Sequence, residues 1–124
     1  ELLGFVFATG QGLPRKLENV QLRIGGPRDT ADLESCRSGE VKKMHRGLGA
    51  YLSRRDQAQL VIKSIEAPHI ENEHGVPFQI FYGISSNTHA FWSIVNARKV
   101  IGYAPEDDSA VHFADQVAEL TRKK

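Results

Sequence analysis

The chain has 124 residues, of which 40% are hydrophobic and 25% charged, the usage of a globular domain rather than of a disordered segment. Sixteen basic side chains face fifteen acidic ones, and a net charge of +1 gives no field that would attract nucleic acid or an anionic membrane. No stretch approaches the roughly 20 apolar residues that are needed to span a bilayer. We therefore expect neither a nucleic acid nor a membrane as partner.

The first predicted element is a helix over about residues 1–9. Four apolar residues recur there at the three-to-four spacing of one helix face: Leu2, Leu3, Val6 and Phe7. Gly10, Gly12 and Pro14 end the helix. The segment has no starting Met and no signal-peptide pattern, and the usual helix start is missing ahead of it. We therefore expect the chain to be part of something longer.

A strand follows over residues 19–25, because Val20, Leu22 and Ile24 alternate with polar residues. Residues 27–46 are polar and predict a long loop with a short helix near 39–44. The loop contains the lone Cys36, which has no internal disulfide partner and favours a reducing, cytoplasmic compartment. Arg37 could lower the pKa of that thiol, but a bystander role is the simpler interpretation.

Ser53 and Asp56 predict a helix start of the capping-box type, and Pro68 ends that helix. Residues 77–84 predict a strand, residues 85–88 a turn, and residues 93–101 and 109–120 two further helices. Helices that alternate with strands in this way indicate an α/β fold with a parallel sheet.

Four segments, in this order along the chain, resemble segments of one branch of the extended short-chain dehydrogenases, the NAD-dependent epimerase/dehydratase family. Residues 23–25 resemble its "RIG" segment, 51–56 its "WLSxRD", 81–87 its "YGISDN" and 97–108 its "ARxxLGYxPQDN". This branch includes uronate dehydrogenases and archaeal-type NAD-dependent glucose-6-phosphate dehydrogenases.

The resemblance implies that residues 1–124 are the C-terminal, substrate-binding portion of such an enzyme. The expected fold is the C-terminal part of a Rossmann-like, doubly wound parallel sheet with the small substrate lobe. NAD would be bound mainly by a missing N-terminal part, because these residues contain no Tyr-x-x-x-Lys and no Gly-rich turn after a strand. The implied reaction is oxidation of a sugar hydroxyl on a uronate or hexose phosphate, and a homodimer is the expected assembly.

The resemblance also places the site. Arg46 occupies the position of an arginine that grips the sugar carboxylate, a task suited to a planar guanidinium, although a solvated loop arginine is the alternative. Gly25 and Gly26 follow the strand where substrate and, at Gly25, nicotinamide are contacted, or they merely permit a turn. Ser85 and Asn87 follow the next strand, as substrate contacts or as simple turn residues.

Other candidates have simpler interpretations. Trp92, with Phe91, could cover the sugar or belong to the core, and Arg54 and Arg55 could line the substrate mouth or face solvent. His69 and His74 flank two glutamates, but nothing fixes that segment, so we assign no metal site and no catalytic residue. The competing hypothesis is a truncated, non-catalytic binding or oligomerisation module, which predicts apolar surface on residues 2–7 and 20–24.

Overall fold

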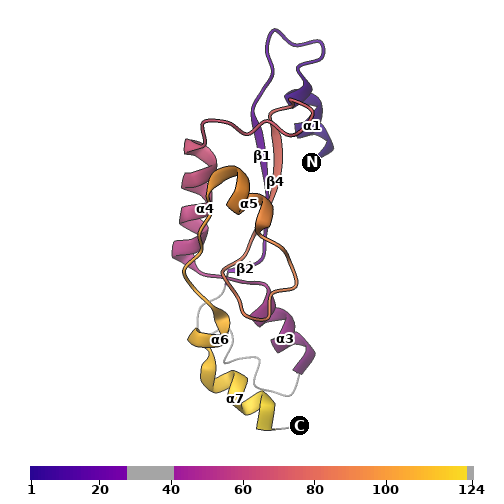
Figure 1. Ribbon diagram of the computed structural model, residues 1–124. Helices are drawn as coiled ribbons and strands as arrows, with labels where there is room; N and C mark the ends of the chain where they lie inside the picture. Colours follow the sequence, from indigo (N-terminus) through magenta and orange to yellow (C-terminus); the bar gives the residue numbers. More distant parts are fainter. Residues whose placement is uncertain (28–40, 123–124) are drawn as a thin grey trace.

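The structure is a computed structural model that describes residues 1–27 and 41–122 (Figure 1). Its elements are α1 (Leu2–Thr9), β1 (Asn19–Ile24), β2 (Gly26–Pro27), α3 (Val41–Gly49), β3 (Tyr51–Leu52), α4 (Arg54–Glu66), β4 (Phe78–Gly83), α5 (Val95–Ile101), α6 (Ser109–His112) and α7 (Ala114–Arg122). The molecule is elongated: α1 and the first strand lie at one end, and α3, α6 and α7 lie at the other (Figure 1). Cys36 and most of the predicted loop lie outside the described residues.

A parallel pair of strands, β1 and β4, forms the centre of the fold, as the alternating pattern predicted. The register runs from Asn19 opposite Phe78 to Ile24 opposite Gly83. Parallel strands require a crossover connection, and α4 lies within it, against one face of the sheet (Figure 1). The predicted α/β arrangement with a parallel sheet is therefore confirmed.

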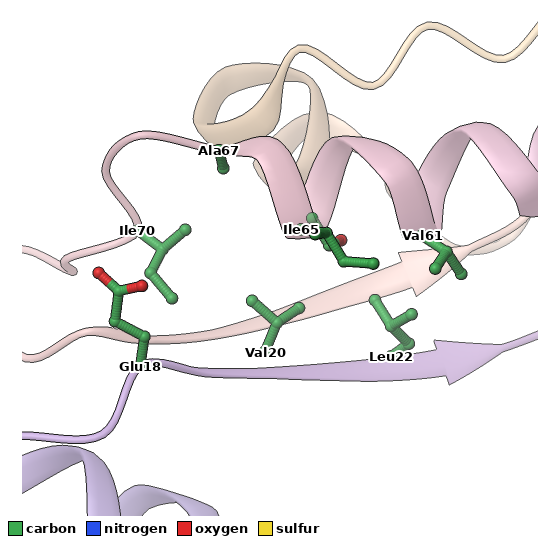
Figure 2. Close-up of a pocket in the computed structure, with 8 residues that line it drawn as sticks. Glu18, Val20, Leu22, Val61, Ile65, Ala67 and Ile70 are labelled. Atoms are coloured by element: carbon green, nitrogen blue, oxygen red, sulfur yellow. The ribbon is translucent and has the colours of Figure 1, made fainter.

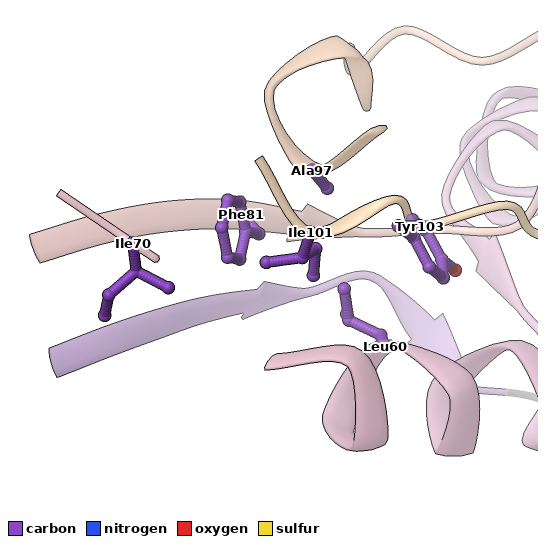
Figure 3. Packing of buried hydrophobic residues seen from close by; sticks show 6 residues of the cluster. All are labelled: Leu60, Ile70, Phe81, Ala97, Ile101 and Tyr103. Carbon is purple, nitrogen blue, oxygen red and sulfur yellow. The ribbon is translucent and has the colours of Figure 1, made fainter. Parts of the chain in front are cut away.

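The main core lies between the sheet, α4 and α5 (Figure 3). It is formed by six buried residues: Leu60, Ile70, Phe81, Ala97, Ile101 and Tyr103. Val20 and Leu22 of β1 pack against this cluster, because alternate residues of a strand share one face. The buried Tyr103 hydroxyl donates to the Ile84 carbonyl at 2.8 Å, and burial raises the pKa of that phenol.

The opposite face of the sheet is covered in part by α1. The rings of Phe5 and Phe78 meet edge to face with centroids 5.4 Å apart. Gly10 ends α1 at φ 72°, in the left-handed region, and Gly102 ends α5 in the same way at φ 69°. These helix ends agree with the predicted ones.

A smaller cluster at the other end joins α3, β3 and the last two helices. Leu48, Tyr51 and Phe113 are buried there, and the rings of Tyr51 and Phe113 pack edge to face at 5.2 Å. This cluster differs from the predictions in two respects. The predicted short helix at 39–44 is a longer one, α3, over 41–49. The single helix predicted over 109–120 is broken at the buried Phe113 into α6 and α7.

Candidate functional site

The carboxyl ends of β1 and β4 meet at one edge of the sheet, where ligands bind in open α/β folds. The Gly25 amide donates to the Gly83 carbonyl at 2.8 Å and so extends the pairing by one residue. The next amide, that of Gly26, donates to the Ala50 carbonyl at 2.7 Å. The Gly25 amide therefore joins the ends of β1 and β4, and the Gly26 amide joins β2 to the residue that follows α3.

Gly25 is required here by space. A Cβ atom at Gly25 would overlap the Ala50 carbonyl oxygen and would approach the Ile84 methyl group to 2.9 Å. The φ angle of Gly25 is not positive, so the backbone conformation itself does not demand glycine. The glycine allows the end of α3 to pack directly on the strand. Glycine is therefore needed at this position for close packing, and not for the turn that the sequence suggested.

Arg46 lies in the last turn of α3, and its side chain is exposed. Its carbonyl accepts from the Ala50 amide at 3.0 Å, so Arg46 stands one helical turn before the residue that touches Gly25 and Gly26. The guanidinium forms no hydrogen bond or ion pair with any other residue in the described part of the chain. The structure therefore brings Arg46, Gly25 and Gly26 to the same edge, and the Arg46 side chain is exposed among the described residues.

The C-terminal carbonyls of α3, which a helix leaves without partners, are bound by side chains from elsewhere. The Ser109 hydroxyl donates to the Leu48 carbonyl at 2.6 Å, and the Asn87 amide donates to the Gly49 carbonyl at 3.3 Å. The same Asn87 amide donates to the Tyr51 carbonyl at 2.9 Å, and its oxygen accepts from the Ser109 amide at 3.1 Å. Asn87 thus holds three segments around the helix that carries Arg46.

Ser85 is also buried, and its hydroxyl accepts from the Ser53 amide at 2.9 Å. The side chains of both predicted ligands in this turn, Ser85 and Asn87, are thus bound to backbone groups of the protein. This arrangement corresponds to the structural alternative given above, and a sugar contact by either residue stays a prediction.

A row of aromatic side chains leads away from the same edge. Phe91 is 53% exposed and packs against Trp92 with ring centroids 5.6 Å apart. Trp92 is half-buried against Tyr82 at 5.0 Å, and Arg23 lies over the Tyr82 ring and donates to its hydroxyl at 2.8 Å. Neither Trp92 nor Phe91 lies in the main core cluster.

The predicted capping box at the start of α4 is only half present. The Ser53 hydroxyl accepts from the Asp56 amide at 3.2 Å, as predicted. The buried Asp56 carboxylate does not return to Ser53; it accepts from the amides of Glu106 and Asp107 at 2.8 and 3.1 Å. Asp56 therefore fastens the segment after α5 to the N-terminus of α4.

Arg55 is not a purely solvated arginine. It forms a bidentate pair with the buried Asp107, with Nε to Oδ2 and Nη2 to Oδ1 both at 2.7 Å. Hydrogen bonds from Arg55, and also from Ser53 and His112, hold the pKa of the Asp107 carboxyl well below its usual range. Sequence reasoning missed this pair, because no local pattern links two charged residues so far apart in the chain.

Two features bear on metal and cofactor binding. His69 and His74 each lie near one glutamate, at 4.0 and 3.4 Å, and residues 1–27 and 41–122 hold no group of three or more candidate metal ligands. Gly10 and Gly12 follow a helix and precede a strand, the reverse of the order in a dinucleotide-binding turn. Gly10 and Gly12 therefore do not form a dinucleotide-binding turn.

Comparison with known proteins identifies relatives of this arrangement. No family model matches the chain. A stretch of 69 residues, 56% of the chain, is 41% identical to an NAD-dependent glucose-6-phosphate dehydrogenase of Haloferax volcanii and covers 24% of that protein. Two solved structures share the fold, each with a TM-score of 0.57 and 22% identity. The crystal structure of glucuronic acid dehydrogenase from Chromohalobacter salexigens matches 92% of this chain over 36% of its own length. A mutated uronate dehydrogenase matches 90% of this chain over 34% of its own.

These matches confirm the resemblance that the four segments indicate, to the branch that contains uronate and glucose-6-phosphate dehydrogenases. The chain spans about a quarter of the curated relative and about a third of each solved structure. None of the helices in the described ranges has the length and apolar character needed to cross a membrane.

Proposed function

We propose that this chain is the substrate-binding portion of an NAD-dependent oxidoreductase that acts on a sugar hydroxyl, with a uronate or a hexose phosphate as substrate. The observation that carries the proposal is the exposed Arg46, held by α3 beside Gly25 and Gly26 at the carboxyl edge of the parallel sheet. A guanidinium offers a planar fork that matches a carboxylate or a phosphate, and both substrate classes carry such a group.

In this proposal each site residue has a defined task. Arg46 binds the anionic group of the sugar. The Gly25–Gly26 backbone contacts the sugar and, at Gly25, the nicotinamide. Ser85 and Asn87, whose side chains are bound to backbone groups, hold β3, the strand with which Gly26 pairs. No residue of the chain is assigned a proton-transfer role.

NAD is the cofactor named for the curated relative, and we extend it to this chain as part of the proposal. When bound, NAD would serve as the acceptor of the hydride removed from the sugar. Since Gly10 and Gly12 follow a helix and precede a strand, we place most of the cofactor contacts on a part of the fold outside these 124 residues, which would complete the doubly wound sheet. A cytoplasmic location and a homodimer belong to the same proposal.

A second candidate is a non-catalytic binding or oligomerisation module derived from the same family. It is favoured by the surface of α1, where Leu2 is 79% and Leu3 69% exposed. It is also favoured by a hollow of about 360 Å³ between β1 and α4, in which Val20 and Leu22 face Val61 and Ile65 (Figure 2). Apolar surface of this kind is commonly covered by another chain or domain.

The experiment that separates the two candidates is an NAD-reduction assay on the protein in the form that its cell produces. Glucuronate, galacturonate and glucose 6-phosphate are offered as substrates, with glucose as the uncharged control. The proposal predicts NADH formation with at least one charged sugar and a higher KM after Arg46→Ala. If no substrate produces NADH above the rate without sugar, and the protein forms a stable oligomer, the module would be supported instead.

A further inference from the structure

Phe91 is a large aromatic residue that exposes 53% of its surface, yet its position is fixed. The ring meets Trp92 edge to face at an angle of 77° and a centroid distance of 5.6 Å. On another side it lies against Gly49, where a Cβ atom would approach Cδ1 and Cε1 of the ring to 2.7 Å. A ring already held in place binds a ligand with little further loss of side-chain entropy.

Phe91 lies on the same face of α3 as Arg46. Arg46 and Gly49 are three residues apart in the helix, and residues at that spacing are neighbours on one face. The missing side chain of Gly49 would point into the Phe91 ring. The Arg46 side chain therefore leaves α3 on the face that Phe91 covers, and this face combines an exposed guanidinium with an exposed, fixed aromatic ring.

That combination matches the two chemical parts of a sugar acid or sugar phosphate. The guanidinium forms charge-assisted hydrogen bonds with the anionic group. The aromatic ring offers a flat apolar surface to the C–H face of a pyranose, and ligand sites characteristically pair such apolar walls with a few polar groups. We infer that Phe91 is the residue on which the sugar ring stacks, an inference that rests on the proposed function.

Gly49 helps to position the Phe91 ring. Any side chain larger than hydrogen at this position would displace the Phe91 ring, since it would also meet the His89 carbonyl oxygen at 2.9 Å. Replacement of Gly49 by alanine therefore moves the ring while Phe91 and Arg46 both remain. This gives a test of ring placement that is independent of removing the ring.

The test measures dissociation constants by isothermal titration calorimetry for glucuronate, glucose 6-phosphate and glucose, with the protein in the form that its cell produces. We expect Phe91→Ala and Gly49→Ala to weaken binding of all three sugars about threefold to tenfold, the range of one aromatic contact. Phe91→Tyr keeps the ring and should bind within about twofold of the unchanged protein. Phe7→Ala, which removes a partly exposed ring from α1, is the matched control and should have no effect. Thermal unfolding of each variant checks that it folds.

Failure of the inference differs from failure of the proposed function. If Arg46→Ala weakens only the charged sugars while Phe91→Ala binds all three normally, the stacking role is overturned and the proposed function stands. If Phe91→Ala weakens all three and Arg46→Ala weakens none, the ring assignment is supported and the arginine assignment is wrong. If the unchanged protein binds none of the sugars, both are overturned.

Discussion

Arg55 and Asp107 form a bidentate ion pair between residues 52 positions apart, with both N–O distances at 2.7 Å. Asp107 is 5% exposed at its side chain and also lies 2.7 Å from His112 Nε2. The pair joins the first turn of α4 to the segment that precedes α6. It therefore ties α4 to the segment that leads into α6.

We expect Asp107→Asn to lower the free energy of unfolding by about 1–2 kcal/mol at neutral pH, since a buried charged acceptor is lost while Arg55 returns to solvent. The folded-state pKa of Asp107 is depressed, so its contribution is complete above the unfolded-state pKa of about 3.9 and is lost as pH falls toward the folded value. Urea unfolding at pH 7, 5, 4 and 3 should show the gap between variant and unchanged protein narrowing below about pH 4.

Glu106→Gln is the matched control for this experiment. Glu106 also contacts Arg55, at 3.1 Å, but its side chain is 63% exposed. Exposed pairs contribute little, so the change should stay within about 0.5 kcal/mol at every pH. A gap for Asp107→Asn that is constant from pH 7 to pH 3 would show that the carboxylate charge is not the source of the effect.

Asn87 is the second residue whose replacement tests the architecture. Asn87→Ala removes hydrogen bonds to the Gly49 and Tyr51 carbonyls and to the Ser109 amide. The Tyr51 carbonyl still accepts from the Ser85 amide at 2.8 Å, so the loss falls mainly on the Gly49 carbonyl and the buried Ser109 amide. We expect a loss of about 2–3 kcal/mol in the free energy of unfolding, measured by urea titration. Ser86→Ala, in the same turn and without a side-chain bond to the described residues, should change stability by less than about 0.5 kcal/mol. Equal effects of the two substitutions would contradict the role given to Asn87.

Gly25 should not tolerate even a methyl group. Gly25→Ala places Cβ against the Ala50 carbonyl, so α3 must move off the strand end, and we expect a cost of about 2 kcal/mol or more. Gly12→Ala is the comparison, because Gly12 has open space around it but a φ of 75°. Its cost should be about 1 kcal/mol, from the backbone alone. Thermal unfolding of both variants shows which substitution costs more stability. A larger loss of stability for Gly12→Ala would refute the packing argument.

The main elements could be predicted because their signals are local. Val20 and Leu22 alternate as a half-buried strand requires, and Gly10 and Gly102 end their helices through backbone freedom that other residues lack. The site could be located in outline for the same reason, since Gly25 and Ser85 each follow a recognisable strand.

The remaining features depend on distant contacts. Tyr51–Leu52 is too short to show any periodicity, and it is a strand only because it pairs with Gly26–Pro27. Asp56 has the sequence position of a capping residue, but the amides after Pro105 compete successfully for its carboxylate. Phe91 is an apolar residue that the sequence alone cannot assign to core or surface, because the neighbour that fixes it, Gly49, has no side chain to reveal the contact.

The most direct test of the central claim is the preference for a charged sugar over glucose, measured as a ratio of dissociation constants before and after Arg46→Ala. A guanidinium that binds the anionic group predicts that this preference falls about tenfold or more, with glucose binding unchanged. Arg15→Ala, an exposed arginine at the opposite end of β1, should leave the ratio as it was. An unchanged ratio in Arg46→Ala would mean that the anionic group is not bound at this edge of the sheet.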